Sequence, residues 1–260
     1  MLHGYRSGES RRRKILMTAI ILAAGYATRM YPLTLNFPKP LLEVGGKRII
    51  DWLLDDLESS GVERTVVVSN HKFIDQFEAW GKERKNVTVL DDGSEDNDHR
   101  LGAVKDIEFA IEKAHINDDI VVLAGDNVFD FSLSSFIEYG RKKKASCIMR
   151  HEEKDIDKLR KTGVIVIDEN EKVMEMEEKP KEPKSIWAVP PFYYYIKEDA
   201  KLIKEGISSG CGTDAPGSFV SWLVKRRPVY AYVMKGKRFD VGSIEGYEKI
   251  KKEYKGITIK

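Results

Sequence analysis

The stretch from Thr18 to Val44, TAIILAAGYATRMYPLTLNFPKPLLEV, joins a short apolar run to a loop of small residues. The run from Ala19 to Ala23 contains two isoleucines and no charge, which is typical of a buried strand in a parallel sheet. The small residues that follow, as far as Thr28, let the backbone approach a ligand closely, and their N–H groups can hold phosphate oxygens. The stretch therefore predicts a strand of a parallel sheet followed by a phosphate-binding loop.

Two basic residues in the same stretch support this interpretation. Arg29 ends the loop, and its guanidinium group is a planar fork that matches phosphate oxygens. Lys39 lies between Pro38 and Pro40, which stiffen the backbone and favour an extended path, so its side chain is expected to project in a defined direction. Taken alone, a glycine and an arginine would favour an ordinary strand and turn with a surface arginine.

Strands and helices alternate through the first half of the chain, which predicts a parallel sheet with crossover helices. From Gly163 the pattern changes to a period of two, and this change predicts a hairpin inserted into the fold. We therefore expect a Rossmann-like α/β fold with a mostly parallel central sheet, flanking helices and an inserted β-hairpin. The expected elements include a helix over 48–60, strands over 64–69, 119–125 and 186–196, and hairpin strands over 163–167 and 172–177.

Length and composition predict a single domain over residues 17–260, because 260 residues with 42% hydrophobic content can bury one large core. Residues 1–16 are basic and lack the apolar segment of a secretory signal, so we expect a disordered or non-native leader, with a basic tether as the alternative. A net charge of +2 does not favour a nucleic-acid partner. Two cysteines and no membrane-length apolar run favour a cytoplasmic protein without a membrane partner.

The opening loop resembles the nucleotide-binding loop of the sugar-1-phosphate nucleotidyltransferases, G-x-G-T-R-x-x-P-x-T followed by P-K-P. The matching residues are Gly25, Thr28, Arg29, Pro32, Thr34 and Lys39. Ala27 stands where the family pattern has its second glycine, and alanine tolerates a positive φ poorly. We therefore expect either that the loop takes a slightly different path at Ala27 or that the family needs a glycine there only because space is limited. Three further motifs follow in the family's order: G-D-N at 125–127, E-K-P-x-x-P-K-S at 178–185 and D-V-G-S at 240–243. This text is nearest to the glucose-1-phosphate thymidylyltransferases of the family.

The resemblance implies a role for each matching residue. The implied catalytic residues are Arg29, Lys39 and Lys179, and the implied magnesium ligands are Asp126 and Asp240. Nucleotide binding is implied for Leu22, Ala23, Ala24, Gly25, Thr28, Asn97 and Gly102, of which Asn97 is the weakest match. Sugar binding is implied for Asn127, Gly163, Glu178, Val189 and Tyr193. The prolines Pro190 and Pro191 depart from the family pattern and are expected to interrupt strand pairing there.

The implied reaction is an in-line attack of a sugar phosphate on the α-phosphorus of an NTP, which gives an NDP-sugar and pyrophosphate. Both reactants are anions, so charge neutralisation by Mg²⁺ and basic residues matters most, and no general base is needed. The expected substrates are dTTP or UTP with glucose 1-phosphate, while cytidylyl and guanylyl transfer stay open. A non-catalytic nucleotide-sugar sensor or regulatory relative is the main alternative. A glycosyltransferase using D-N-D at 96–98 would leave the opening loop unexplained, and a homo-oligomer is left open.

Overall fold

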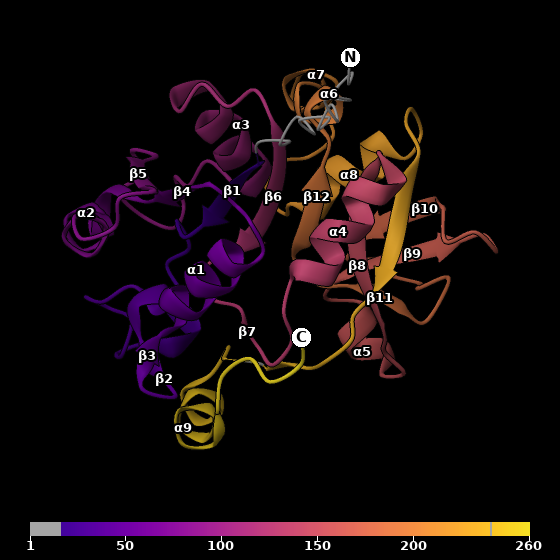
Figure 1. Cartoon of the computed structure of the whole chain (residues 1–260). Helices are drawn as coiled ribbons and strands as arrows, with labels where there is room; N and C mark the ends of the chain where they lie inside the picture. The colour runs from indigo at the N-terminus through magenta and orange to yellow at the C-terminus, as the bar shows by residue number, and fades with distance from the viewer. Residues whose placement is uncertain (1–16, 240) are drawn as a thin grey trace, which may run out of the picture.

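The computed structural model describes residues 17–239 and 241–260, and its centre is one large mixed sheet (Figure 1). The strands follow the order β10-β9-β11-β8-β12-β6-β1-β4-β5, and β13 pairs with β8 beside this path. Their bounds are β1 (Met17–Leu22), β4 (Arg64–Ser69), β5 (Val87–Asp91), β6 (Asp119–Ala124), β8 (Ser146–Glu152), β9 (Gly163–Ile167), β10 (Val173–Glu178), β11 (Trp187–Val189), β12 (Phe192–Tyr195) and β13 (Val229–Val233).

The half of the sheet around β1 is parallel, as the sequence predicts. Strand β1 pairs in parallel with β4 on one side and with β6 on the other, and β5 continues the sheet beyond β4. Leu22 and Ala124 are paired at the ends of β1 and β6, so the segments that follow these two strands leave the sheet at the same edge. Open α/β sheets bind ligands beyond the carboxyl ends of such strands.

The other half of the sheet is mixed. Strand β12 runs antiparallel to both β6 and β8, and β9 and β10 form the predicted antiparallel hairpin. The single strand expected over 186–196 is wrong, because Pro190 and Pro191 separate it into β11 and β12. Proline has no N–H for the sheet ladder, so pairing stops at the two prolines. Strand β11 pairs with β8 and β9, whereas β12 pairs with β6 and β8.

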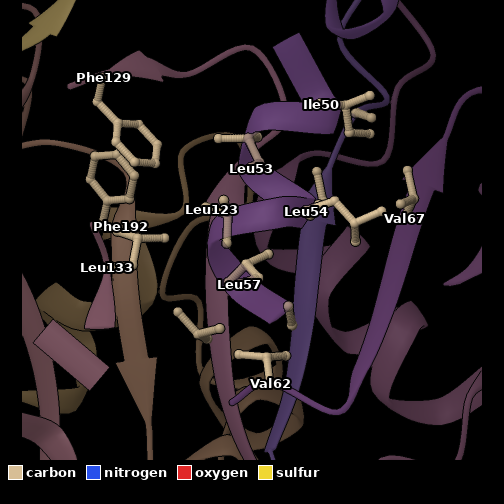
Figure 2. Close-up of a cluster of buried hydrophobic side chains, with 14 of the residues drawn as sticks. Ile50, Leu53, Leu54, Leu57, Val62, Val67, Leu123, Phe129, Leu133 and Phe192 are labelled. Atoms are coloured by element: carbon tan, nitrogen blue, oxygen red, sulfur yellow. The ribbon is translucent and has the colours of Figure 1, made fainter. Parts of the chain in front are cut away.

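Helices cover both faces of the sheet because successive strand residues point to opposite sides. On one face, Ile21, Val67 and Leu123 pack with helices α1, α2 and α4. Figure 2 shows Ile50, Leu53, Leu54 and Leu57 of α1 lying over this face. On the other face, Ile20 and Val122 pack with α3, α7 and α8. The bounds are α1 (Ile49–Ser59), α2 (Ile74–Gly81), α3 (Ala103–Lys113), α4 (Ser134–Lys143), α5 (Ile156–Leu159), α6 (Lys197–Ala200), α7 (Ile203–Ser208), α8 (Gly217–Leu223) and α9 (Ile244–Glu253).

The last helix packs against the segment that follows the opening loop (Figure 1, lower left). The Tyr247 hydroxyl of α9 donates to the Glu43 carbonyl at 3.1 Å, and the Tyr254 hydroxyl donates to the Phe129 carbonyl at 2.7 Å. Tyr254 also meets Trp52 of α1 edge to face, with ring centroids 5.4 Å apart. Two short strand pairs lie in this region: β2 (Glu43–Val44) with β3 (Lys47–Arg48), and β7 (Val128–Phe129) with β14 (Arg238–Phe239). The 3₁₀ helices are η1 (Thr28–Met30), η2 (Lys39–Leu41) and, before α2, η3 (His71–Phe73).

Within the described ranges, none of the helices combines the length and apolar character that crossing a bilayer requires. The predicted cytoplasmic location stays a prediction.

Candidate active site

A cavity of about 390 Å³ lies at the carboxyl ends of β1 and β6. Leu22 is the last residue of β1 and lines this cavity. Four other residues that the sequence predicts for the site also line it: Ala23, Ala24, Gly25 and Arg29. Lys39 of η2 and Asp126, two residues after β6, line the same cavity. The parallel pairing of β1 with β6 therefore brings together residues that lie far apart in the sequence.

The loop after β1 presents free backbone amides. Among the described residues, no hydrogen bond is donated by the N–H groups of residues 24–27, whereas the N–H of Ala23 is bound to the Val68 carbonyl. The loop is held instead through other groups: the Ala24 carbonyl accepts from Asn70 Nδ2 at 3.0 Å, and the Tyr26 hydroxyl donates to the Ser94 carbonyl at 2.8 Å. A rigid loop with consecutive free N–H groups is suited to bind an anion.

Ala27 adopts the left-handed conformation, with φ 48° and ψ 41°. Alanine thus adopts a positive φ at the position where the family pattern has its second glycine. The strain, on the order of 1 kcal/mol, is offset by two hydrogen bonds to the Ala27 carbonyl, from Met30 N at 2.9 Å and from Thr34 Oγ1 at 2.8 Å. Thr34 of the motif thus has a structural role. A side chain at Gly25, in contrast, would meet nothing within 4 Å, because that position faces open space.

Lys39 and Asp126 form an ion pair, with Nζ and Oδ2 2.6 Å apart. Pro38 and Pro40 hold Lys39 at the start of η2, and Lys39 is only 8% exposed. Burial acts to raise the pKa of Asp126, but the charges of Lys39 and, less strongly, Arg238 outweigh it and hold this pKa below its ordinary value. Asp126 is therefore ionised at neutral pH.

The chemistry of Asp126 suits a magnesium ligand. Its side chain is 44% exposed and lines the cavity as an ionised carboxylate. Magnesium is commonly bound through one or two carboxylates together with substrate phosphates. Asp240, the second predicted ligand, lies outside the described residues. Gly242, two positions later in the sequence, lines the cavity. Across residues 17–239 and 241–260, no group of three or more His, Cys, Asp or Glu side chains is placed to hold a metal ion.

The predicted sugar-binding residues of the antiparallel half lie close to one another. Gly163 of β9 pairs with Glu178 of β10 and with Val189 of β11. A Cβ atom on Gly163 would lie 3.1 Å from Glu178 Oε2, so this glycine leaves room for the carboxylate. Burial raises the pKa of Glu178 despite the opposing charge of Lys179. Tyr193 is buried on β12, and the charge of Glu178 adds to the effect of burial in raising the pKa of Tyr193.

Asn127 is 1% exposed, and neither atom of its side-chain amide has a hydrogen-bond partner in the described part of the chain. Buried polar groups are normally paired, and an unpaired one costs stability. Asn127 directly follows Asp126 at the end of β6, where the two halves of the sheet meet.

Lys179 takes part in an ion-pair chain that the sequence does not reveal. Its backbone has φ 51°, its side chain is exposed, and Nζ lies 3.5 Å from Asp214 Oδ2. Asp214 Oδ1 accepts from Arg100 Nη2 at 2.8 Å. Asp214 and Arg100 line the cavity, whereas Lys179 lies outside its wall. Asp214 is in a turn-rich stretch of ordinary composition, so no sequence signal distinguishes it.

Gly102 begins helix α3 with φ 94°, and a Cβ atom there would lie 2.6 Å from the Thr213 carbonyl oxygen. This close approach lets Ala103 N and Val104 N donate to the carbonyls of Asp214 and Thr213. Gly102 lines the cavity, and its nucleotide role stays a prediction. Asn97 lies outside the cavity wall, and its side-chain oxygen accepts from Arg100 Nη1 at 3.0 Å. Thr28 opens η1 and is exposed outside the wall. The nucleotide roles of Asn97 and Thr28 stay predictions.

Asp106, in the first turn of α3, lines the cavity and is also missed by the sequence analysis. Burial and the neighbouring charge of Asp92 raise the pKa of Asp106 to about 7. Asp92 is fixed by Ser94, whose N and Oγ donate to Asp92 Oδ1 at 2.7 and 2.6 Å. Two acidic residues that are 14 positions apart become neighbours only in the folded chain, which is why their interaction leaves no mark in the sequence.

Replacing Asp106 with asparagine is expected to stabilise the protein in a pH-dependent manner. The folded-state pKa of about 7 lies above the ordinary value of 3.8, so the carboxyl lowers stability as pH rises through this window. Asp106→Asn should raise Tm by about 4 °C or more near pH 8 and change it little near pH 4. Thermal unfolding at both pH values measures this difference. Glu112→Gln, an exposed change on the same helix, is the control, and an equal shift at both pH values would contradict the prediction.

The free amides of the loop and the basic side chains of Arg29, Lys39 and Arg100 lie around one cavity beside the ionised Asp126. Such a site at the carboxyl ends of parallel strands is typical of an α/β protein that binds nucleotides. The family model described as nucleotidyl transferase matches residues 18–256, and the chain belongs to this family. The resemblance to the sugar-1-phosphate nucleotidyltransferases is confirmed, as are the α/β fold class and the assignment as an enzyme.

Relatives with different substrates resemble the chain to a similar degree. It is 32% identical to a glucose-1-phosphate adenylyltransferase of Fervidobacterium nodosum, with 88% of this chain and 59% of the relative covered. It is 32% identical to a UTP–glucose-1-phosphate uridylyltransferase of Haloferax volcanii, with 87% and 91% covered. A structure described as a glucose-1-phosphate thymidylyltransferase from Bacillus anthracis superposes with a TM-score of 0.75 at 25% identity, covering 94% of this chain and 97% of that one. These names carry three different nucleobases and therefore do not decide the base.

Proposed function

We propose that the protein transfers a nucleotidyl group from an NTP to a sugar 1-phosphate in a Mg²⁺-dependent reaction that releases pyrophosphate. The observation that carries this proposal is the meeting of free loop amides, Arg29 and the Lys39–Asp126 pair around one cavity. Both reactants are anions, and such a site neutralises and aligns them without needing a general base. The sequence contains every arginine, lysine and aspartate that the resemblance implies for catalysis and metal binding, which argues against a non-catalytic relative.

The phosphates of the NTP fit the loop side of the cavity. The amides of residues 24–27 would bind phosphate oxygens, and Arg29 would hold the β- and γ-phosphates that leave as pyrophosphate. Lys39 lines the same cavity and would neutralise the α-phosphate. Lys179 is exposed, and its one ion pair among the described residues is with Asp214 at 3.5 Å, so its side chain would be free to turn to the sugar phosphate.

Enzymes of this family generally use a divalent metal ion. Asp126 would hold Mg²⁺ here, together with Asp240. The ion would supply positive charge to the phosphate oxygens as negative charge moves between them. The pairing of Asp126 with Lys39 keeps the carboxylate ionised and ready for a cation.

The sugar would lie toward the antiparallel half of the sheet. Glu178 can accept hydrogen bonds from sugar hydroxyls, and the missing Cβ atom of Gly163 lets this carboxylate lie close to the backbone of β9. Asn127 has an unpaired donor and acceptor that sugar hydroxyls would satisfy. Val189 and Tyr193 would form the apolar part of this wall. We propose glucose 1-phosphate as the sugar substrate, since the E-K-P-x-x-P-K-S text is nearest to enzymes that use it. The same sequence motif favours dTTP or UTP as the nucleotide substrate.

Pyrophosphate release tests the proposal. The protein is incubated with Mg²⁺, glucose 1-phosphate and each common NTP in turn, and sugar-dependent release of pyrophosphate is expected with at least one of them. Absence of release with every NTP, together with calorimetric binding of an NDP-sugar, would instead support a sensor. Gly25→Ala is the matched variant: its Cβ would touch no protein atom, so Tm should hold or rise slightly while the KM for the NTP rises.

A further inference from the structure

Arg100, Asp214 and Lys179 form a chain of two ion pairs beside the cavity. Asp214 Oδ1 accepts from Arg100 Nη2 at 2.8 Å, and Asp214 Oδ2 lies 3.5 Å from Lys179 Nζ. Arg100 and Asp214 line the cavity, as do Lys39 and Asp126. Two cations are therefore held on either side of one carboxylate group at the wall of the proposed reaction site.

This chain of ion pairs joins the two parts of the site. On the nucleotide side, Arg100 lies shortly before α3, and the Asp214 carbonyl accepts from Ala103 N, at the start of α3, at 3.2 Å. On the sugar side, Lys179 directly follows Glu178, the last residue of β10. The backbone of Asp214 is thus fixed to α3, while its carboxylate reaches toward the residues proposed for the sugar.

The Asp214 carboxylate marks a place that suits an oxyanion. Carboxylate and phosphate groups both present pairs of oxygens to which guanidinium and ammonium groups donate. The side chain of Asp214 is 59% exposed, and ion pairs between exposed groups contribute little stability. A phosphate group with two negative charges can therefore replace this carboxylate between the two cations.

The phosphate of the sugar substrate fits this place better than the phosphates of the NTP. The opening loop and Arg29 are proposed to hold the triphosphate, whereas the two cations lie next to Glu178 on the sugar side. The sugar phosphate must also reach the α-phosphorus near Lys39 and Asp126, which line the same cavity as Asp214. This inference rests on the proposed function.

We propose that Arg100 is a further substrate-binding residue and that Asp214 is its displaceable counter-ion. Until a substrate binds, the Asp214 carboxylate occupies the oxyanion site between Arg100 and Lys179. The phosphate of the sugar 1-phosphate then takes this place and contacts both cations, while the carboxylate turns toward solvent. The carboxylate therefore competes with the substrate, and its removal strengthens the binding that the removal of Arg100 weakens.

Two substitutions with opposite expected effects test the proposal without turnover. Calorimetric titration with glucose 1-phosphate should show Asp214→Asn binding about 3- to 10-fold more tightly than the wild type, because the competing charge is gone. Arg100→Met should bind glucose 1-phosphate roughly 10-fold more weakly, because a charge-assisted contact is lost. In steady-state kinetics, the KM for glucose 1-phosphate should change in the same directions, with little change in the KM for the NTP.

The exposed ion pair of Lys204 with Glu112 supplies matched controls outside the cavity wall. Lys204→Met and Glu112→Gln each remove a charge of the same sign as the test variants do, and both should leave the affinity for glucose 1-phosphate unchanged. Thermal unfolding checks the fold, and the Tm of Arg100→Met and Asp214→Asn should stay within about 3 °C of the wild type, because the broken pairs are exposed.

Three results would overturn the proposal. Weaker binding of glucose 1-phosphate in both variants would show that Asp214 only holds Arg100 in place. Equal tightening of glucose 1-phosphate, UTP and dTTP in Asp214→Asn would report a general effect of charge. The third result is binding of glucose 1-phosphate that is too weak to measure in both the wild type and Asp214→Asn.

The same measurements separate this inference from the proposed function. Pyrophosphate release with unchanged KM values in both variants would leave the proposed function standing and remove the roles of Arg100 and Asp214. Affinities for glucose 1-phosphate that shift in the expected directions, without turnover with any NTP, would support the oxyanion site and remove the proposed function.

Discussion

Replacing Asp126 with asparagine is expected to lower kcat by about 1,000-fold or more. The change removes the negative charge proposed to hold Mg²⁺, and metal stabilisation of phosphate charge contributes several kcal/mol to such reactions. Steady-state kinetics at saturating substrates, with Mg²⁺ varied, measures the loss. Asparagine is preferable to alanine because its side-chain oxygen still accepts from Lys39, which is 8% exposed and would otherwise be left buried without a partner.

The fold of this variant is checked by thermal unfolding. Asp157→Asn, which changes an exposed carboxylate on α5 that pairs with Arg160, is the matched control and should retain full activity. A wild-type rate for Asp126→Asn at ordinary Mg²⁺ concentrations would refute the metal assignment.

Replacing Arg29 with alanine is expected to lower kcat by roughly a hundredfold or more. The proposed partner of Arg29 is the pyrophosphate group, whose charge grows as the bond to the α-phosphorus breaks, so the interaction strengthens in the transition state. Arg29 is exposed on the cavity wall, and it has no carboxylate within ion-pair distance in residues 17–239 and 241–260. Its removal should therefore cost little stability.

Kinetics with each substrate varied in turn distinguish this role from that of an ordinary surface arginine. Arg29→Lys should not restore kcat, since a point charge cannot span two phosphate oxygens as the guanidinium fork does. An Arg29→Ala enzyme with unchanged kcat would remove the main support for the phosphate-binding loop.

The elements around the site were predictable where local pattern and burial agree. Apart from Thr18 and Asp119, strands β1 and β6 are apolar, because each is covered on both faces, and Asp126 follows β6 at the edge where the opening loop begins. The hairpin of β9 and β10 follows from its period of two. Helix ends are less well determined: the helix expected over 48–60 spans 49–59. The interruption of the strand over 186–196 was foreshadowed by Pro190 and Pro191, whose effect on pairing is local.

Interactions between distant residues could not be predicted in the same way. The sequence suggests roles for Lys39 and Asp126 separately, but their ion pair joins positions 87 residues apart and depends on the β1–β6 pairing. The same holds for Asp92 with Asp106, neither of which belongs to a motif, and for Lys179 with Asp214, of which only Lys179 does. At Ala27, local propensity gives the wrong backbone conformation. Hydrogen bonds from Thr34 and Met30 stabilise a left-handed conformation that alanine disfavours.

The contact of α9 with the segment after the opening loop has a consequence for the growing chain on the ribosome. The segment that carries Lys39 leads directly into β2, and the Glu43 carbonyl of β2 is bound by Tyr247, which is translated 204 residues later. The central strands β1, β4 and β6 can pair long before that point. During synthesis, the central sheet can therefore form before the proposed nucleotide site is complete. A nascent chain that still lacks α9 would hold a formed sheet beside a Lys39–Glu43 segment without the hydrogen bond from Tyr247. Competence to bind nucleotide would then arrive late, once the last helix has emerged.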